Sequence, residues 1–410
     1  KIILLILCGM VVLATGALVL YHMTLSAQIQ KRLDAIRAEG FPVTLEELDA
    51  WYPAVAEAEN AATVYGQAFA AYAEYPTSGE RAAELPIVGT AKLPARNQPI
   101  DDQMKARISG YLEANAEALQ LIHKAAGMEK CRFPIDLRQG AGVLLPHLAS
   151  MRQGARLLHV EGVLRIEEGR GGEAARSVID TVKLSRALSK EPLLISSLVR
   201  IASLSIGRAN LERVLSRMTL SDADLAALSK AFEAAEEPEA WSRGMVGERC
   251  KGIAILQSPR QAIGMNLGET VNISPWMIPA LRLSWMLKRE EIRYLDVMGK
   301  TVDLAQMPAV ERAQALNSGL LEELESKHHG IFAAVLLPAL SRATTEDTKC
   351  VARLRTARAA LAVERYRLKY GRLPESVKAL VPEFLPQSIA DPFDGQPLRY
   401  LRQETGYIVY

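Results

Sequence analysis

The N-terminal stretch Ile2–Leu20, IILLILCGMVVLATGALVL, decides the architecture of this chain because it contains no charged residue. A membrane-spanning helix needs about 20 mostly apolar residues, so the stretch is long enough to cross a bilayer. The alternative is a signal peptide cleaved near Leu25-Ser26-Ala27, but the apolar region of a signal peptide usually has only about 7–15 residues. We therefore expect a retained anchor that contacts the lipid bilayer through residues 2–20.

The orientation of this anchor depends on its basic flanks. Lys31, Arg32 and Arg37 follow the apolar stretch, and Lys1 precedes it. A strict count of Lys and Arg would place the C-terminal side in the cytoplasm, yet long domains translocate largely regardless of charge. We expect a single-pass protein of the inner membrane with the bulk of the chain outside the cytoplasm.

The composition of the 410 residues excludes several classes of protein. Lys and Arg number 49 and Asp and Glu number 47, so the net charge of +2 offers no bulk attraction to nucleic acid, and we expect no nucleic-acid partner. Hydrophobic residues make up 49%, which excludes a disordered chain.

Four cysteines are too few for a disulfide scaffold. In an oxidising compartment two of three could pair, and the sequence does not select the pair among Cys131, Cys250 and Cys350.

Helix signals dominate the chain after the anchor. Thr44 with Glu47 and Ser221 with Asp224 have capping-box spacing, which predicts helices that begin just after Thr44 and Ser221. We expect stacked helical hairpins and no strand before about residue 390. Residues 162–188 resemble one tetratricopeptide-type hairpin, with Gly162, Gly169 and Ala174 at plausible positions. No second copy follows at a fixed period, so a generic antiparallel helix pair is the alternative.

The stretch Ile273–Met298 is the most apolar one outside the anchor. Arg282, Lys288 and Arg289 interrupt it, which makes it a poor second membrane span. One hypothesis is a helix lying on the membrane surface, with Trp276 and Trp285 at the depth of the lipid headgroups as candidate membrane-interface residues. The alternative is a core helix of the helical domain.

Motifs that carry known chemistries are missing from the sequence. His328 and His329 have no second ligand at a zinc-like spacing. The segment Gly169–Ala174 fits a loose dinucleotide-binding pattern, but the residues before it read as helix rather than strand. We expect no catalytic residue, cofactor or metal, while an active site assembled from distant positions would escape this kind of reading.

The C-terminal region carries several signals in a fixed order. The apolar run Ala334–Ala343 precedes a helix containing Ala360–Tyr366, which Gly371 and Pro374 stop. The turn Asp391-Pro392-Phe393-Asp394-Gly395-Gln396-Pro397 follows, and then a β-hairpin formed by residues 398–402 and 407–410 is expected. Together these segments resemble bacterial type II secretion pseudopilins, and the whole chain is similar to large membrane-anchored helical proteins of bacteria that carry such a tail.

The resemblance implies a compact module of helix and hairpin in residues 330–410. In pseudopilins the apolar helix comes directly after a processed leader, whereas here it is internal, and the calcium-binding loop of that family lies beyond the hairpin. Neither calcium binding nor filament assembly is therefore carried over. The helix of this module is rich in arginine. These side chains form either a solvated basic face or a binding face for an acidic partner, and they are Arg353, Arg355, Arg358, Arg365 and Arg367.

These observations predict a mainly α protein with an N-terminal transmembrane helix, a helical-hairpin (tetratricopeptide-like) domain and a small C-terminal α+β-hairpin module. The expected divisions are residues 1–38, 39–329 and 330–410. The expected function is that of a non-catalytic scaffold or accessory subunit of a bacterial envelope assembly, with protein partners. The alternatives are an extracytoplasmic enzyme with a non-linear active site, or a helical receptor for a peptide or lipid.

Overall fold

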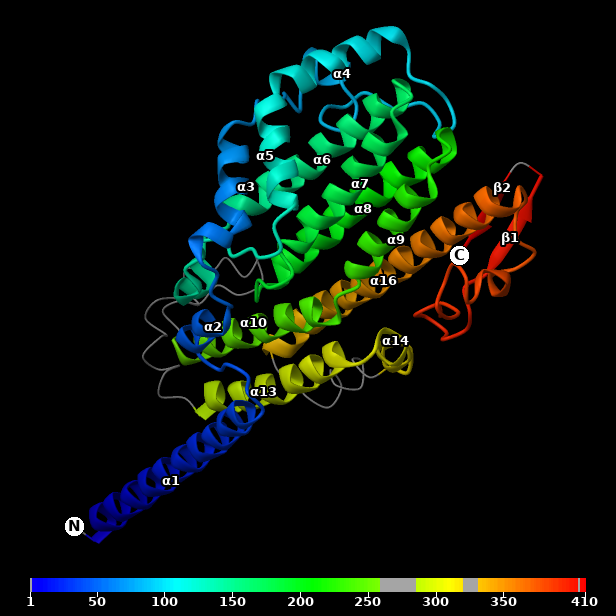
Figure 1. Cartoon of the computed structure of the whole chain (residues 1–410). Helices are drawn as coiled ribbons and strands as arrows, with labels where there is room; N and C mark the ends of the chain where they lie inside the picture. Colours follow the sequence, from blue (N-terminus) through cyan, green and yellow to red (C-terminus); the bar gives the residue numbers. More distant parts are fainter. Residues whose placement is uncertain (1, 259–284, 320–330, 405) are drawn as a thin grey trace.

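The computed structural model describes residues 2–258, 285–319, 331–404 and 406–410. Helices make up most of these residues, and a two-stranded antiparallel sheet lies near the C-terminus (Figure 1). The prediction of a mainly helical chain with a leading apolar helix and a small terminal sheet is therefore confirmed. Trp276, Arg282, His328 and His329 lie outside the described residues.

Helix α1 (Ile2–Ala38) is one continuous rod with two different surfaces. Its described side chains are exposed through Tyr21 and mostly apolar, and α1 is the one helix among the described residues that is long and apolar enough to cross a membrane. Its second half buries a stripe against α13 (Trp285–Gln306), at the helical spacing of four, four and three residues. The stripe consists of Leu25, Ile29, Leu33 and Ile36.

An outer layer of short helices follows, and side-chain caps set where they begin. It consists of α2 (Leu45–Trp51), α3 (Ala61–Ala70), α4 (Asp102–Ala114) and α5 (Ala116–Ala126). The Thr44 hydroxyl accepts a hydrogen bond from the Glu47 backbone N–H at 3.1 Å, and the Glu47 carboxylate accepts one from the Val43 N–H at 2.8 Å. The predicted helix start after Thr44 is confirmed, because this cap satisfies backbone donors that a helix end leaves unpaired.

The centre of the body is formed by three consecutive helices, α6 (Pro146–Glu167), α7 (Gly171–Arg186) and α8 (Leu194–Arg217), which pack on one another. Gly169 turns the chain between α6 and α7 with a φ of +73°. Gly162 lets α6 approach α8, since a Cβ there would lie 2.3 Å from the Asn210 amide nitrogen. The helix pair expected at residues 162–188 is present, with Ala174 fully buried.

The remaining helices enclose this centre. They are α9 (Asp222–Ala234), α10 (Pro238–Gln257), α13, α14 (Ala309–Asn317) and α16 (Ile331–Tyr370). The start predicted after Ser221 is confirmed, because its hydroxyl accepts from the Asp224 N–H at 3.1 Å. Helix α10 packs on α8 and α13, and α16 packs along α8 and α9.

Helix α16 belongs to two hydrophobic cores. Leu340, Cys350 and Leu361 join the main core, which extends back to Ile29 on α1. Ala362 and other residues near its end form a smaller core with the C-terminal segment: Ala359, Val363, Val377, Leu380, Leu385, Ile389 and Leu398. The division drawn at residues 329 and 330 therefore falls just before a helix that packs in the body from Leu340 to Leu361 and supports the tail with residues from Ala359 onward.

The tail ends in the hairpin of β1 (Tyr400–Gln403) and β2 (Gly406–Val409), paired so that Tyr400 faces Val409. This agrees with the expected terminal hairpin, with strand ends that differ by one or two residues. Among the described residues the sheet contains these two strands alone.

The close crossing of α10 over the segment before α8 yields a stability prediction. A Cβ at Gly247 would lie 1.7 Å from the Pro192 carbonyl oxygen, whereas a Cβ at Gly299 in α13 meets nothing within 4 Å. We expect Gly247→Ala to lower the free energy of unfolding by about 2 kcal/mol or more. Gly299→Ala should raise it by up to about 1 kcal/mol through helix propensity.

Thermal unfolding of the full chain in detergent, followed by circular dichroism, measures both changes. Equal shifts for the two variants would show that the backbone approach at Gly247 is absent.

Candidate functional site

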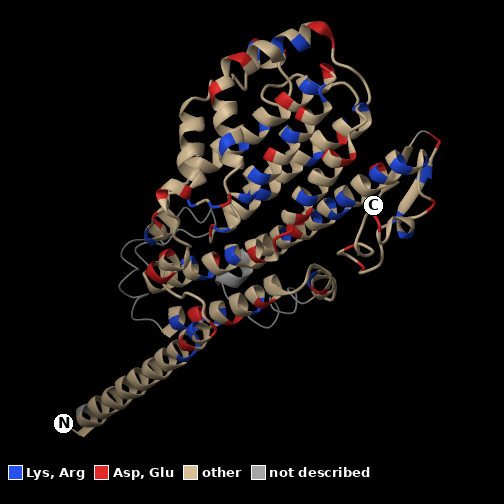
Figure 2. Cartoon of the chain, viewed as in Figure 1, with Lys and Arg blue, Asp and Glu red and all other residues tan. Residues whose placement is uncertain are grey.

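The junction between anchor and body carries aromatic and basic side chains. Tyr21 on α1 and Trp285 at the start of α13 meet edge to face, with ring centroids 6.1 Å apart. The Arg289 guanidinium lies 5.5 Å from the Trp285 ring centroid, and Lys288 donates to the α1 backbone. Figure 2 shows that the part of α1 beyond this point is free of charge. Aromatic and basic side chains at the end of an apolar span are typical of the membrane–water interface. Trp285, one of the two residues predicted there, thus lies beside the end of the apolar surface of α1.

An ion pair reinforces the apolar contact between α1 and α13. Arg32 holds Asp296 with two parallel hydrogen bonds of 2.8 and 3.1 Å. Both side chains are one-third exposed, so the pair adds orientation more than stability. Apolar packing and one bidentate ion pair therefore join α1 to α13.

The arginines of α16 face an acidic helix of the same chain (Figure 2). Arg355 lies 2.6 Å from Glu236 and also donates to the Ala390 carbonyl at 2.8 Å. Arg358 pairs with Glu233 and also lies 3.8 Å from Glu236, and Arg365 pairs with Asp222 at 2.7 Å.

The two remaining arginines of this face have different surroundings. Arg367 pairs with Glu364 within α16 at 2.5 Å, and Arg353 lies near α8 with no acidic partner among the described residues. The acidic surface met by Arg355, Arg358 and Arg365 is therefore α9 and the residues just after it. A role of the five arginines in binding another protein stays a prediction.

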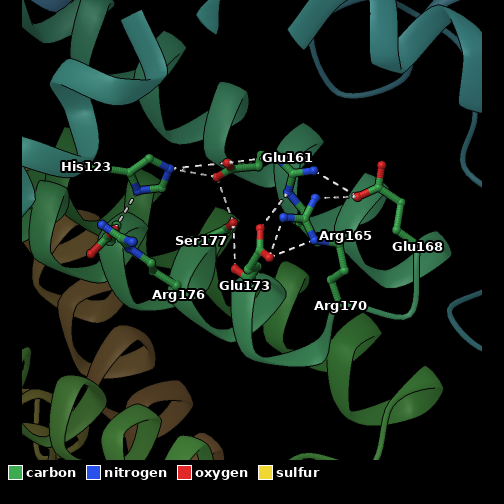
Figure 3. Close-up of polar contacts among 9 residues, drawn as sticks. His123, Glu161, Arg165, Glu168, Arg170, Glu173, Arg176 and Ser177 are labelled. Atoms are coloured by element: carbon green, nitrogen blue, oxygen red, sulfur yellow. Dashed lines mark hydrogen bonds and ion pairs between the residues drawn. The ribbon is translucent and has the colours of Figure 1, made fainter. Parts of the chain in front are cut away.

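A cavity of about 720 Å³ opens between α4, α5, α6 and α7. His123 of α5 lies at its wall, between two carboxylates that come from the next two helices (Figure 3). Nδ1 lies 2.6 Å from Asp180 and Nε2 lies 3.0 Å from Glu161. The Ser177 hydroxyl donates a hydrogen bond of 2.8 Å to the Glu161 carboxylate. The carboxylates of Glu161 and Asp180 are buried, so each depends on these partners.

The two carboxylates keep His123 protonated. Burial alone lowers the pKa of His123, but the hydrogen bonds and negative charges of Asp180 and Glu161 outweigh it and raise the pKa to about 9. Burial raises the pKa of Glu161, and the contacts with His123 and Ser177 bring it below its usual value. At neutral pH both ring nitrogens therefore carry protons and donate them to carboxylates, which leaves no lone pair to act as a general base.

A second buried network lies near the start of α8. Glu191 accepts a hydrogen bond of 2.6 Å from Ser196 and lies 3.0 Å from Nε2 of His147. The His147 ring stacks on Phe133, with centroids 4.3 Å apart. In both networks the serine hydroxyl donates its hydrogen bond to a carboxylate rather than to a histidine. Neither arrangement is therefore a Ser–His nucleophile pair.

Metal and thiol chemistry have little support in the described part of the chain. No group of three or more His, Cys, Asp or Glu side chains there could hold a metal ion. All four cysteines are free thiols, so the structure pairs none of Cys131, Cys250 and Cys350. Burial raises the pKa of both Cys250 and Cys350 to about 12, which keeps them protonated and unreactive.

Comparison of the chain with protein-family models, with curated proteins and with solved structures gives no match.

The His123 network predicts a loss of stability at alkaline pH. A folded pKa of about 9 lies above the unfolded value of about 6.5, so the contribution is complete below pH 6.5 and disappears as pH rises through 9. We expect the free energy of unfolding to fall by up to about 3 kcal/mol over this window. Unfolding of the full chain in detergent as a function of pH measures this loss of stability.

His123→Gln should flatten the pH profile of stability, and Lys124→Gln, at an exposed neighbour, should leave the profile unchanged. A wild-type profile that is flat between pH 6.5 and 10 would refute the assignment.

The contacts of α16 predict different roles for two neighbouring arginines. Arg355→Ala removes hydrogen bonds to Glu236 and to the Ala390 carbonyl, and should lower the free energy of unfolding by about 2 kcal/mol. Arg353→Ala should change it by less than about 0.5 kcal/mol. Denaturant unfolding compares the two, and an equal effect would contradict the pairing of α16 with α9.

The position of Trp285 predicts its response to lipid. In liposomes with bromine atoms near the lipid carbonyls, part of the tryptophan fluorescence of the full chain should be quenched. Trp285→Phe should remove a substantial share of this quenching, because its ring lies beside Tyr21 at the end of the apolar surface. Trp51→Phe, in α2, should leave the quenching unchanged. Unaltered quenching in the Trp285 variant would exclude the interfacial position.

Proposed function

We propose that this protein is a single-pass inner-membrane protein whose extracytoplasmic body serves as a non-catalytic scaffold or accessory subunit of an envelope assembly. The observation that carries the proposal is the continuity of α1, which is exposed and apolar at one end and buried against α13 at the other. Such a helix holds the body at the membrane in a set orientation, which an assembly subunit needs.

The architecture of the body supports this function. The helices α6, α7 and α8 stack as hairpins, which we interpret as a tetratricopeptide-like unit, and such stacks offer broad surfaces for other proteins. The tail, with its proposed resemblance to pseudopilins, stands at the end of the molecule opposite the N-terminus of α1 (Figure 1). A body extended in this way can contact neighbours at a distance from the bilayer.

The enzyme alternative has less support from the site geometry. The cavity beside His123 is large enough for a small ligand. However, the His123 ring is a cation whose two nitrogens are engaged by Glu161 and Asp180. A catalytic role would require this network to break open when substrate binds.

Affinity purification of the full chain in mild detergent tests the proposal. We expect envelope proteins to co-purify in a complex heavier than the monomer. The matched bait carries residues 1–24 of this chain fused to an unrelated soluble domain, so that partners held by the anchor alone are subtracted. Recovery of the full chain as a monomer without partners would overturn the scaffold function.

A further inference from the structure

A second hollow, of about 980 Å³, runs along one edge of the C-terminal hairpin. Helices α8 and α16 and strand β2 line it. Of strand β1, the last residue Gln403 lines it and residues 400–402 do not. Three leucines supply part of its apolar wall, namely Leu211, Leu215 and Leu373. The hollow is thus a groove beside an exposed strand edge.

The hydrogen-bond register shows which groups of β2 face this groove. Arg399 and Tyr410 exchange two backbone hydrogen bonds, of 2.7 and 3.0 Å, so they form a hydrogen-bonded pair. Such pairs alternate along an antiparallel ladder, and the N–H and C=O groups of Tyr407 and Val409 therefore point away from β1. Among the described residues β2 has no other strand partner, so this edge can accept one more strand.

Contacts with α16 hold the edge in place. The Tyr407 hydroxyl donates to the Glu364 carboxylate at 2.8 Å and lies 3.2 Å from the Ala360 carbonyl oxygen. Tyr400 and Val409 pack with Tyr407 on the smaller core. Because the hairpin is already ordered on α16, a ligand strand would meet a preformed edge and incur little ordering cost.

The charges around the groove favour an acidic ligand. Four arginines and two glutamates line it. Glu212 pairs with Arg96 and Arg208, and Glu364 pairs with Arg367. The fourth arginine, Arg372, is exposed and has no acidic partner among the described residues. Two positive charges therefore remain uncompensated beside the strand edge.

We propose that this groove binds an extended, acidic peptide segment of a partner protein, which adds as a third strand to the free edge of β2. Backbone groups of Tyr407 and Val409 would supply the hydrogen bonds. Alternate side chains of the segment would meet the leucines of the groove and the arginines at its rim. A second copy of this chain suits the edge less well, because it would bring the same arginines to the same place. The inference deepens the scaffold function by naming its partner class.

Binding of a defined peptide to the full chain in detergent tests the inference. The probe is a fluorescein-labelled peptide of alternating glutamate and valine, and anisotropy reports its binding. Two control peptides replace glutamate by lysine, or every second valine by proline. We expect the acidic probe to bind about tenfold or more tightly than either control. Equal affinities for the three peptides would overturn the inference.

Paired substitutions locate the binding. Val409→Pro removes an N–H that points away from β1 at the groove, whereas Arg402→Pro removes an N–H at the opposite edge of the hairpin, outside the groove. Arg372→Glu reverses a charge in the groove, whereas Arg402→Glu reverses one on β1, outside the groove. We expect the first member of each pair to weaken probe binding about tenfold and the second to change it about twofold or less. Circular dichroism confirms that each variant folds.

The outcomes separate this inference from the scaffold function. If partners co-purify with the full chain but the probe does not bind, the groove assignment fails and the scaffold function stands. If the probe binds in the groove but no partner co-purifies, the scaffold function fails. A dimer that Val409→Pro dissociates, without probe binding, would assign the edge to a second copy and overturn the acidic peptide.

Discussion

The packing of the second half of α1 against α13 is the contact on which the rest of the structure depends. Four large apolar side chains are buried along it, and burial of each is worth about 1.5–3 kcal/mol, so the stripe contributes on the order of 6–12 kcal/mol. The pair of Arg32 with Asp296, one-third exposed, adds only about 1 kcal/mol or less. Apolar burial therefore fixes the anchor to the body, and the ion pair selects its rotation. A flexible linker at this place would leave the body free to tumble above the bilayer.

Helix α16 extends this constraint to the far end of the molecule. Its residues from Leu340 to Leu361 pack in the main core, and its last turns support the hairpin through the smaller core and the hydroxyl of Tyr407. The arginines that pair with α9 keep the same helix aligned along the body. A chain of packed contacts thus leads from α1 to the groove beside β2. If a partner segment binds there, its position relative to α1 is set by the fold.

Local signals in the sequence predicted the parts of the fold that local chemistry determines. The caps at Thr44 and Ser221, the apolar anchor and the terminal hairpin each depend on residues within a few positions of one another. The candidate sites depend on residues that the fold brings together. No local sequence pattern marks His123 as part of a site, because Glu161 and Asp180 lie 38 and 57 positions away. The arginines of α16 read as a solvated or partner-binding face because the sequence does not show that α9, more than 100 residues earlier, lies alongside. The groove escaped the sequence analysis for the same reason, since α8 and β2 meet only through α16.

The central claim is that α1 is held rigidly against the body. The distance between α1 and the body, measured by double electron–electron resonance spectroscopy in nanodiscs, tests it most directly. One spin label is placed on Cys8 in the exposed part of α1 and the other on Lys230→Cys in α9, after the other three cysteines are changed to alanine. A rigid junction predicts a single narrow distribution of distances, which Leu33→Glu should broaden by placing a charge in the buried stripe. A distribution that is already broad, or has several maxima, in the chain with an intact stripe would contradict the account.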